Sequence, residues 1–290
     1  MPDPKTTLLV LLAGIAILFA LFWGYSLRRQ PHGSIWPNPL QCLIGFVTDF
    51  LDTLGVGSFA VTTALFRFGK VVDDDKIPGT LNVGHTLPTI LQALIYIQVV
   101  EIDPTTLWLL IIASGLGSYF GVAFVTSLPK HKIQIAMGIS LLVAVAFILG
   151  RLLGFYPQGN DSIGLSGGFL VLGFIGNFVF GALMTIGVGA YAPIMVMVGL
   201  LGMTETTAFP LMMGSCAFLM PIASYRFIQS GKYDAKSALG LTLLGLPAVA
   251  IAAWIVKSLP LDAVKWLVVV VVIYTACSML NSGLKSKREG

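Results

Sequence analysis

The sequence has 290 residues, of which 56% are hydrophobic and only 10% are charged, and its formal net charge is +4. A soluble domain carries about 25% charged residues, so this composition excludes an ordinary soluble enzyme and predicts a polytopic helical membrane protein. The few basic residues lie in loops, where they indicate membrane orientation, and we expect no nucleic-acid partner.

The first apolar segment covers residues 6–27 and ends at Arg28 and Arg29. A helix of this length spans a hydrocarbon core of about 30 Å. The positive pair follows the apolar run and no small-residue cleavage site closes it, so we predict a retained helix and not a signal peptide. The positive-inside rule then places the N-terminus outside, with residues 1–35 forming the first helix and a cytoplasmic loop.

The next segment, residues 36–68, is too long for one span and too short for two spans with a loop. The run Gly55-Val56-Gly57-Ser58 interrupts it, and glycine both permits unusual turns and weakens a helix. Two interpretations stay open. The segment is either one long tilted or kinked helix, or a re-entrant hairpin of two half-helices that returns to the side it came from.

The charges that follow favour the hairpin. Helices are expected over 77–99, 104–128 and 133–152. If residues 36–68 are re-entrant, the basic loops fall in the cytoplasm and the acidic loop falls outside, as the positive-inside rule prefers. The residues concerned are Arg67, Lys70, Lys130 and Lys132 on the inside and Glu101 and Asp103 on the outside.

The second half repeats this pattern. Residues 164–202 again exceed one span and break at Gly187-Val188-Gly189, and helices are expected over 207–228, 237–257 and 261–281. Gly55 and Gly187 are 132 residues apart, as are Pro78 and Pro210. With three full spans per half, the second copy must be inverted, and inverted repeats with interrupted helices are typical of secondary transporters.

We therefore predict an all-α polytopic membrane protein with two inverted-topology repeats. Each repeat would hold a glycine-broken, re-entrant helix pair and three transmembrane helices, and one extra helix would precede them. Repeat 1 would cover 36–155 and repeat 2 would cover 156–290, with a basic cytoplasmic C-terminal tail. The expected location is the cytoplasmic (inner) membrane, with membrane lipid as a partner and a homodimer as an open alternative.

Each glycine break also predicts a binding site. A half-helix that begins after a break presents free backbone N–H groups and a positive dipole end. Ser58 is expected to cap the first half-helix, and Tyr191 lies near the start of the second. Two such ends that converge at the midplane would bind a small anion without a lysine; the alternative is that the glycines serve close helix packing. The predicted substrate-binding residues are Gly55, Gly57, Ser58, Asn82, His85, Thr86, Gly187, Gly189, Tyr191 and Ser215.

Asp49, Asp52 and His85 are candidates for ion coupling. The two aspartates are three residues apart and therefore share a helix face. Ionisable groups at membrane depth are costly and so are functional candidates, and a histidine titrates in a range suited to protons. The competing interpretation is that these side chains only make hydrogen bonds that pack helices together.

The sequence contains no recognisable set of catalytic residues. No histidine pair has metal-ligand spacing, no phosphate-binding loop is present, and the three cysteines, Cys42, Cys216 and Cys277, are isolated in apolar segments. We therefore expect neither an enzyme nor a cofactor nor a metal site.

Two stretches carry a family resemblance. Residues 49–60, DFLDTLGVGSFA, and residues 187–193, GVGAYAP, together with 202–208, resemble the TauE/SafE family of sulfite and organosulfonate exporters. The resemblance covers about residues 40–282 and leaves the N-terminal helix outside. Ser58 and Ala190 stand where the family often has another glycine, and Val61 replaces the first-half proline that Pro193 keeps in the second half.

This resemblance implies a permease that moves a small sulfur-containing anion across the cytoplasmic membrane, usually outward, by alternating access. An inside-negative potential favours anion exit by about 2.3 kcal/mol per charge per 100 mV. A transporter or channel for another small anion or carboxylate, with or without proton coupling, is the alternative. A membrane scaffold or enzyme without transport is the third hypothesis.

Overall fold

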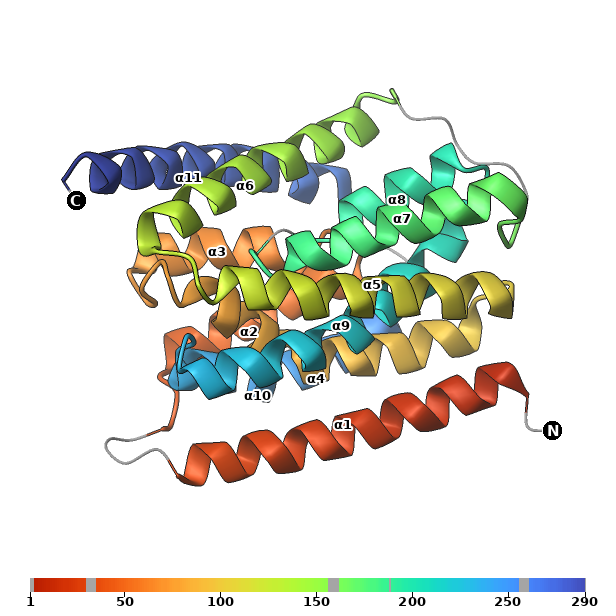
Figure 1. The fold of residues 1–290 in the computed structure, drawn as a ribbon, viewed down its shortest axis with the longest axis horizontal. Coiled ribbons are helices and arrows are strands. Elements are labelled where there is room, and N and C mark those ends of the chain that lie inside the picture. The colour runs from red at the N-terminus through yellow and green to blue at the C-terminus, as the bar shows by residue number, and fades with distance from the viewer. Residues whose placement is uncertain (1–2, 30–34, 156–161, 188, 256–260, 290) are drawn as a thin grey trace.

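The computed structural model describes residues 3–29, 35–155, 162–187, 189–255 and 261–289. Over these ranges the chain is helical, and its only β-type pairing is a single bridge between Ser162 and Met203. Figure 1 shows the helices running roughly along one direction. They are α1 (Pro4–Arg28), α2 (Pro39–Thr53), α3 (Ser58–Gly69), α4 (Ile77–Val99), α5 (Pro104–Val125), α6 (Lys130–Leu152), α7 (Gly167–Met184), α8 (Tyr191–Leu200), the short η1 (Glu205–Thr207), α9 (Ala208–Ser230), α10 (Ala235–Ile255) and α11 (Leu261–Glu289).

Six of the described helices are long and apolar enough to cross a membrane: α1, α5, α6, α7, α9 and α10. The protein is therefore an all-helical, multi-pass membrane protein. The helix expected over 237–257 corresponds to α10, and Lys257 lies outside the described residues. The last helix, α11, continues through the basic tail to Glu289 and does not end at residue 281.

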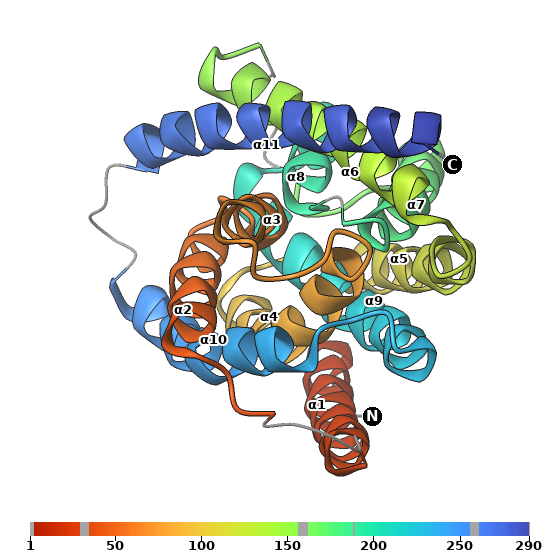
Figure 2. The same ribbon diagram turned by 90° about the vertical axis from the view of Figure 1, so that its left-hand side faces the viewer.

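The centre of the bundle is formed by α4 and α9, which pack against each other. Figure 2 shows α1 at one edge and α6 with α11 at the opposite edge. Most of α4 is buried, including the polar side chains of its inner face. Because a lipid-facing helix cannot carry so many polar groups without cost, the central position of α4 explains how this sequence is accommodated.

The two glycine runs do break the helices. The first break separates α2 from α3, and the second separates α7 from α8. Gly55, Gly57 and Gly187 have φ angles of +82°, +92° and +101°, which only glycine adopts without strain. A long continuous helix over residues 36–68, one of the two interpretations of the sequence, is therefore excluded.

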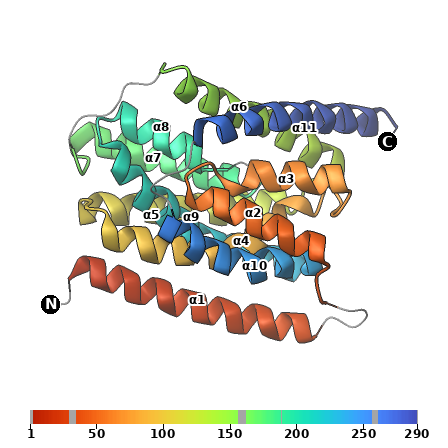
Figure 3. The same ribbon diagram turned by 180° about the vertical axis from the view of Figure 1, so that it is seen from behind.

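Each broken pair forms a hairpin. A Cβ atom at Gly69, at the end of α3, would lie 3.7 Å from Leu40 Cδ2 at the start of α2. In the second pair, the N–H of Thr204, just after α8, donates to the carbonyl of Ser162, just before α7, at 2.9 Å. The first hairpin opens toward one end of the bundle and the second toward the other end (Figures 1 and 3).

The helix contacts also repeat. Helix α2 packs against α10 as α7 packs against α5. Helix α4 packs against α10 as α9 packs against α5, and α3 packs against α11 as α8 packs against α6. Close glycine contacts support both equivalent interfaces: a Cβ at Gly240 would lie 2.9 Å from Gln41 Cβ of α2, and one at Gly121 would lie 2.8 Å from Ala182 Cα of α7. Small residues at such positions let membrane helices approach closely.

Candidate functional site

The two glycine breaks face each other near the centre of the bundle. A Cβ atom at Gly57 would lie 3.9 Å from Tyr191 Cβ, and one at Gly189 would lie 3.6 Å from Phe59 Cβ. Since Gly57 and Gly189 are 132 residues apart, as are Phe59 and Tyr191, the two contacts are equivalent. The starts of α3 and α8 are therefore brought together, as expected for the predicted site.

A small cavity of about 10 Å³ lies between the two helix starts. Its volume is close to the minimum needed for one water molecule, so the described conformation has no room for an oxyanion. The cavity is lined by residues from both breaks and both halves of the chain: Asp52, Gly57, Ser58, Phe59, Thr89, Met184, Gly189, Ala190 and Tyr191.

The start of α3 is already occupied by a carboxylate. Gly57 is the N-cap residue, and Oδ1 of Asp52 accepts a hydrogen bond of 2.5 Å from the N–H of Ser58. The prediction that Ser58 caps this helix is therefore wrong, because Ser58 is its first residue and receives the cap. No described side chain caps α8 in the same way, so the two helix starts differ.

The other oxygen of Asp52 has no hydrogen-bond partner among the described residues. Asp52 is only 2% exposed, and its Oδ2 is fully buried. A buried polar atom without a partner is costly. Because Asp52 also lines the central cavity, this oxygen marks a point where a proton or a ligand would be stabilised.

Asp49 and His85 form a buried pair beside Asp52. His85 Nδ1 lies 2.7 Å from Asp49 Oδ1, and His85 Nε2 lies 3.1 Å from Thr62 Oγ1. Thr62 Oγ1 also lies 2.9 Å from the carbonyl oxygen of Ser58. A carbonyl only accepts, so the hydroxyl proton points to Ser58 and His85 Nε2 must donate to Thr62.

This hydrogen-bond pattern sets the charge of the pair. One proton remains between His85 Nδ1 and Asp49, whether it resides on the imidazole or on the carboxyl. In both cases the Asp49–His85 pair is neutral as a unit, and Asp52 is left as the uncompensated acid. The order of acid, histidine and hydroxyl matches a nucleophilic triad, but Thr62 already donates its only proton to the backbone and is fully buried.

A second hydrogen-bond chain connects the two repeats. The hydroxyl of Tyr191, the first residue of α8, donates to Gln92 Oε1 at 2.8 Å, and Gln92 Nε2 donates to Thr53 Oγ1 at 3.0 Å. Gln92 is not among the site residues predicted from the sequence. The signal was present, because His85, Thr89 and Gln92 recur at helical spacing and so share one face of α4.

The remaining predicted residues lie away from the cavity. Asn82 Nδ2 donates to the carbonyl of Pro78, and Thr86 Oγ1 lies 3.2 Å from Ser224 Oγ of α9. Ser215 Oγ accepts from Asn177 Nδ2 at 2.8 Å. Thr86 and Ser215 therefore join helices to one another, whereas Asn82 bonds within α4, and none of the three lines the cavity.

Two predicted glycines lie at the outer edges of the breaks. A Cβ at Gly187 would lie 3.0 Å from Met137 Cε of α6. Gly55 borders a separate cavity of about 30 Å³, which it shares with Arg151 and the α8 residue Ala192. Arg151 of α6 thus lies beside the first break.

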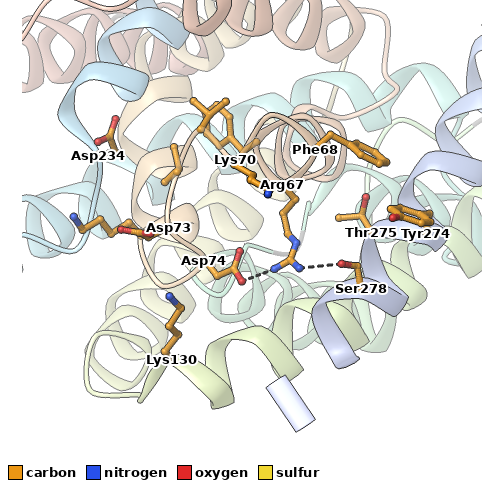
Figure 4. Close-up of a pocket in the computed structure, with 14 residues that line it drawn as sticks. Arg67, Phe68, Lys70, Asp73, Asp74, Lys130, Asp234, Tyr274, Thr275 and Ser278 are labelled. Carbon is orange, nitrogen blue, oxygen red and sulfur yellow. Dashed lines mark hydrogen bonds and ion pairs between the residues drawn. The ribbon is translucent and has the colours of Figure 1, made fainter. Parts of the chain in front are cut away.

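A much larger cavity, of about 550 Å³, lies at the end of the bundle where α3 ends and α6 begins. Figure 4 shows Arg67 at its wall, paired with Asp74 and donating to Ser278 Oγ of α11 at 2.9 Å. Lys70 and Lys130 also line this cavity. Arg67 of α3 and Asp74 of the following loop are both partly buried, and Arg67 connects α3 to α11.

The described residues contain no cluster of three or more His, Cys, Asp or Glu side chains that would hold a metal ion. Among the comparisons with known proteins, a family model described as Sulfite exporter TauE/SafE matches residues 3–148 and 40–279. The first match begins at residue 3, so the N-terminal helix, which the resemblance left outside, is included. The comparisons with curated proteins and with solved structures found no match.

Proposed function

The chain belongs to the sulfite exporter TauE/SafE family, and we propose that it exports a small sulfur-containing anion, such as sulfite or an organosulfonate, across the cytoplasmic membrane. The observation that carries this proposal is the reciprocal approach of the two breaks, in which Gly57 faces Tyr191 and Gly189 faces Phe59. Each break directs the start of a half-helix at the same small cavity.

Backbone N–H groups at these helix starts would bind the anion. Four N–H groups at the start of an α-helix lack an intrahelical partner, and the helix dipole adds a partial positive charge there. An oxyanion accepts several hydrogen bonds and so suits two converging helix starts. None of the residues lining the central cavity is a lysine or arginine, so backbone groups would carry most of the binding.

We further propose that both hairpins are re-entrant and that residues 36–155 and 156–290 are inverted repeats. Two observations support this. The hairpins open toward opposite ends of the bundle, and the helix contacts of one repeat have counterparts in the other. Such repeats rock against each other in secondary transporters, which exposes a central site to each side in turn.

The distribution of basic residues supports an orientation. Arg28, Lys70, Lys130 and Lys232 all lie near the end of the bundle toward which the α2–α3 hairpin opens. The acidic residues Glu101 and Asp103 lie at the other end, where α5 begins. By the positive-inside rule, the basic end would face the cytoplasm and the large cavity beside Lys130 would be the cytoplasmic approach to the site.

Flux through proteoliposomes tests this proposal. Gly189→Leu would fill the central cavity and abolish exchange of sulfite across the membrane, and Gly57→Leu would do the same. Gly14→Leu is the matched control, because a Cβ at Gly14 on α1 meets nothing within 4 Å and exchange should persist. Exchange at the wild-type rate in both Gly189→Leu and Gly57→Leu would contradict the proposed site.

A second candidate function is transport of another small anion or a carboxylate. The buried acid and histidine side chains favour it, because sulfite export down a gradient needs no titratable group, whereas the site holds three of them: Asp49, Asp52 and His85. Exchange measured over a panel of sulfite, sulfonates and short carboxylates separates the two candidates. A preference for carboxylates would favour the second.

A further inference from the structure

The start of α3 cannot bind a substrate anion while the Asp52 carboxylate holds it. Asp52 Oδ1 accepts the hydrogen bond of the Ser58 N–H, which is one of the free donors that the anion would use. A substrate anion would also lie beside a second negative charge in a cavity that contains no lysine or arginine. The Ser58 N–H must therefore be released and the charge of Asp52 must be neutralised before this helix start can bind a substrate anion.

A proton on Asp52 would remove the negative charge and weaken the hydrogen bond from the Ser58 N–H, because a neutral carboxyl oxygen is a weaker acceptor than a carboxylate. Building on the proposed function, we infer that Asp52 is a tethered competitor of the substrate: its carboxylate occupies the α3 helix start when the site is empty, and the anion replaces it only after Asp52 has taken up a proton. The Oδ2 oxygen, which is buried and has no hydrogen-bond partner among the described residues, is the atom that receives this proton.

The surroundings of Asp52 leave it as the group that changes charge. The pair formed by Asp49 and His85 is neutral as a unit and already shares its proton through a 2.7 Å hydrogen bond. Arg151 lines the neighbouring cavity and not the central one. The titratable groups that interact electrostatically with Asp52 are Asp49 on α2, His85 and Tyr96 on α4, Tyr191 on α8 and Cys216 on α9.

The two helix starts then have different roles. Among the described residues no carboxylate accepts a hydrogen bond from the start of α8, so no tethered anion competes for that helix start. The start of α3 becomes available only with a proton. One proton therefore crosses with each anion: it is taken from the side on which the anion binds and is released on the other side when the anion leaves and Asp52 recaps Ser58.

This coupling has a consequence for the driving force. A monovalent anion and one proton together carry no charge, so their transport responds to a pH difference and not to voltage. A divalent anion such as the sulfite dianion still moves one net negative charge outward, which keeps export favoured by an inside-negative potential.

The test uses methanesulfonate in proteoliposomes, because a sulfonate stays monovalent over the working pH range and only the protein titrates. In the wild type, net flux should follow an imposed pH difference and ignore a voltage imposed with a potassium gradient and valinomycin. Asp52→Asn keeps an oxygen that can cap Ser58 but cannot change charge, and its flux should follow voltage and ignore the pH difference. Glu101→Gln, an exposed acid at the other end of the bundle, should behave as the wild type.

The outcomes separate the two proposals. If the net flux of methanesulfonate through Asp52→Asn still follows the pH difference and ignores voltage, the role of Asp52 is overturned and the proton is assigned to Asp49 and His85. A wild type that exchanges neither methanesulfonate nor sulfite would overturn the proposed function itself.

A second measurement uses only the wild-type protein and therefore does not require any variant to fold. The apparent Kd of the wild-type protein for methanesulfonate, measured in detergent by thermal shift, should rise about tenfold per pH unit once Asp52 is ionised, as one-proton linkage requires. An apparent Kd that stays constant from acid to alkaline pH would show that no proton is taken up with the anion and would overturn the inference.

Discussion

The Asp52 carboxylate of α2 accepts a hydrogen bond of 2.5 Å from the backbone N–H of Ser58, the first residue of α3. The bond spans the glycine break, so a side chain from one half-helix satisfies the backbone of the other. It joins the two halves at the point where the helix is interrupted, and it places an acid at the proposed anion site.

The first prediction concerns this cap. Asp52→Ala should be less stable than Asp52→Asn by about 1 kcal/mol, because alanine leaves the Ser58 N–H unpaired whereas asparagine can cap it. The comparison between the two variants removes the effect of the charge, which both lack. Thermal unfolding of the purified proteins in detergent measures the difference, and equal melting temperatures would contradict the capping role.

The second prediction concerns the pair formed by Asp49 and His85. His85→Gln and Asp49→Asn should each destabilise the protein by about 3 kcal/mol, because each leaves the other member buried without its partner. The double variant should lose clearly less than the sum of the two, since it leaves no unpaired charge. Unfolding measured for all four proteins completes the cycle; strictly additive losses would mean that the two groups act independently.

The third prediction compares two glycines that occupy equivalent positions. Gly57→Ala should cost about 1–2 kcal/mol because its φ of +92° is unfavourable for any residue with a Cβ. Gly189→Ala should change stability by less than about 0.5 kcal/mol, because a Cβ there meets Phe59 Cβ at an ordinary 3.6 Å. Melting temperatures check this, and equal losses at the two positions would contradict the cost assigned to the positive φ of Gly57.

The fourth prediction concerns the re-entrant hairpin. Cysteines introduced at Lys70 and at Lys130 should both react with a membrane-impermeant thiol reagent from the same side, and a cysteine at Glu101 should react from the other side. The background protein would carry serine at the exposed Cys277 and the half-buried Cys42. Labelling of positions 70 and 130 from opposite sides would mean that residues 36–68 cross the membrane.

The fifth prediction concerns the large cavity next to α3. Lys70→Gln with Lys130→Gln should lower the initial rate of anion transport several-fold at low ionic strength and by much less at high salt, because their charges act mainly by attracting anions to the cavity. Lys5→Gln, at the opposite end of the bundle, is the control for the loss of a positive charge away from the cavity, and each single variant, Lys70→Gln and Lys130→Gln, is compared with it. A reduction that is the same at all salt concentrations would argue against attraction.

Several features followed directly from the residues. Long apolar runs predicted membrane helices, since a helix satisfies its backbone polar groups within a single segment in lipid, and the six apolar helices and the family match confirm a multi-pass membrane protein of this family. The breaks at Gly55 and Gly187 were also predictable, because glycine is the residue that tolerates their positive φ.

The partners of individual polar side chains were less predictable. Asn82 and Thr86 are polar and lie within one turn of His85, yet Asn82 bonds to Pro78 of its own helix and Thr86 bonds to Ser224 of α9, whereas His85 bonds to Asp49 of α2 and Thr62 of α3. Helical spacing gives only a direction around the axis of α4. The residue that a side chain meets in that direction depends on how α9 and α3 pack against α4. These are contacts between segments far apart in the sequence.

The sequence by itself determined the membrane class, the two breaks and their spacing of 132 residues, because hydropathy and glycine conformation are local properties. Only the tertiary structure decided that the breaks face each other, that Asp52 occupies the start of α3 and that Asp49 is neutralised by His85. These relationships join segments far apart in the chain, and their energies come from burial and hydrogen-bond geometry that exist only once the helices have packed.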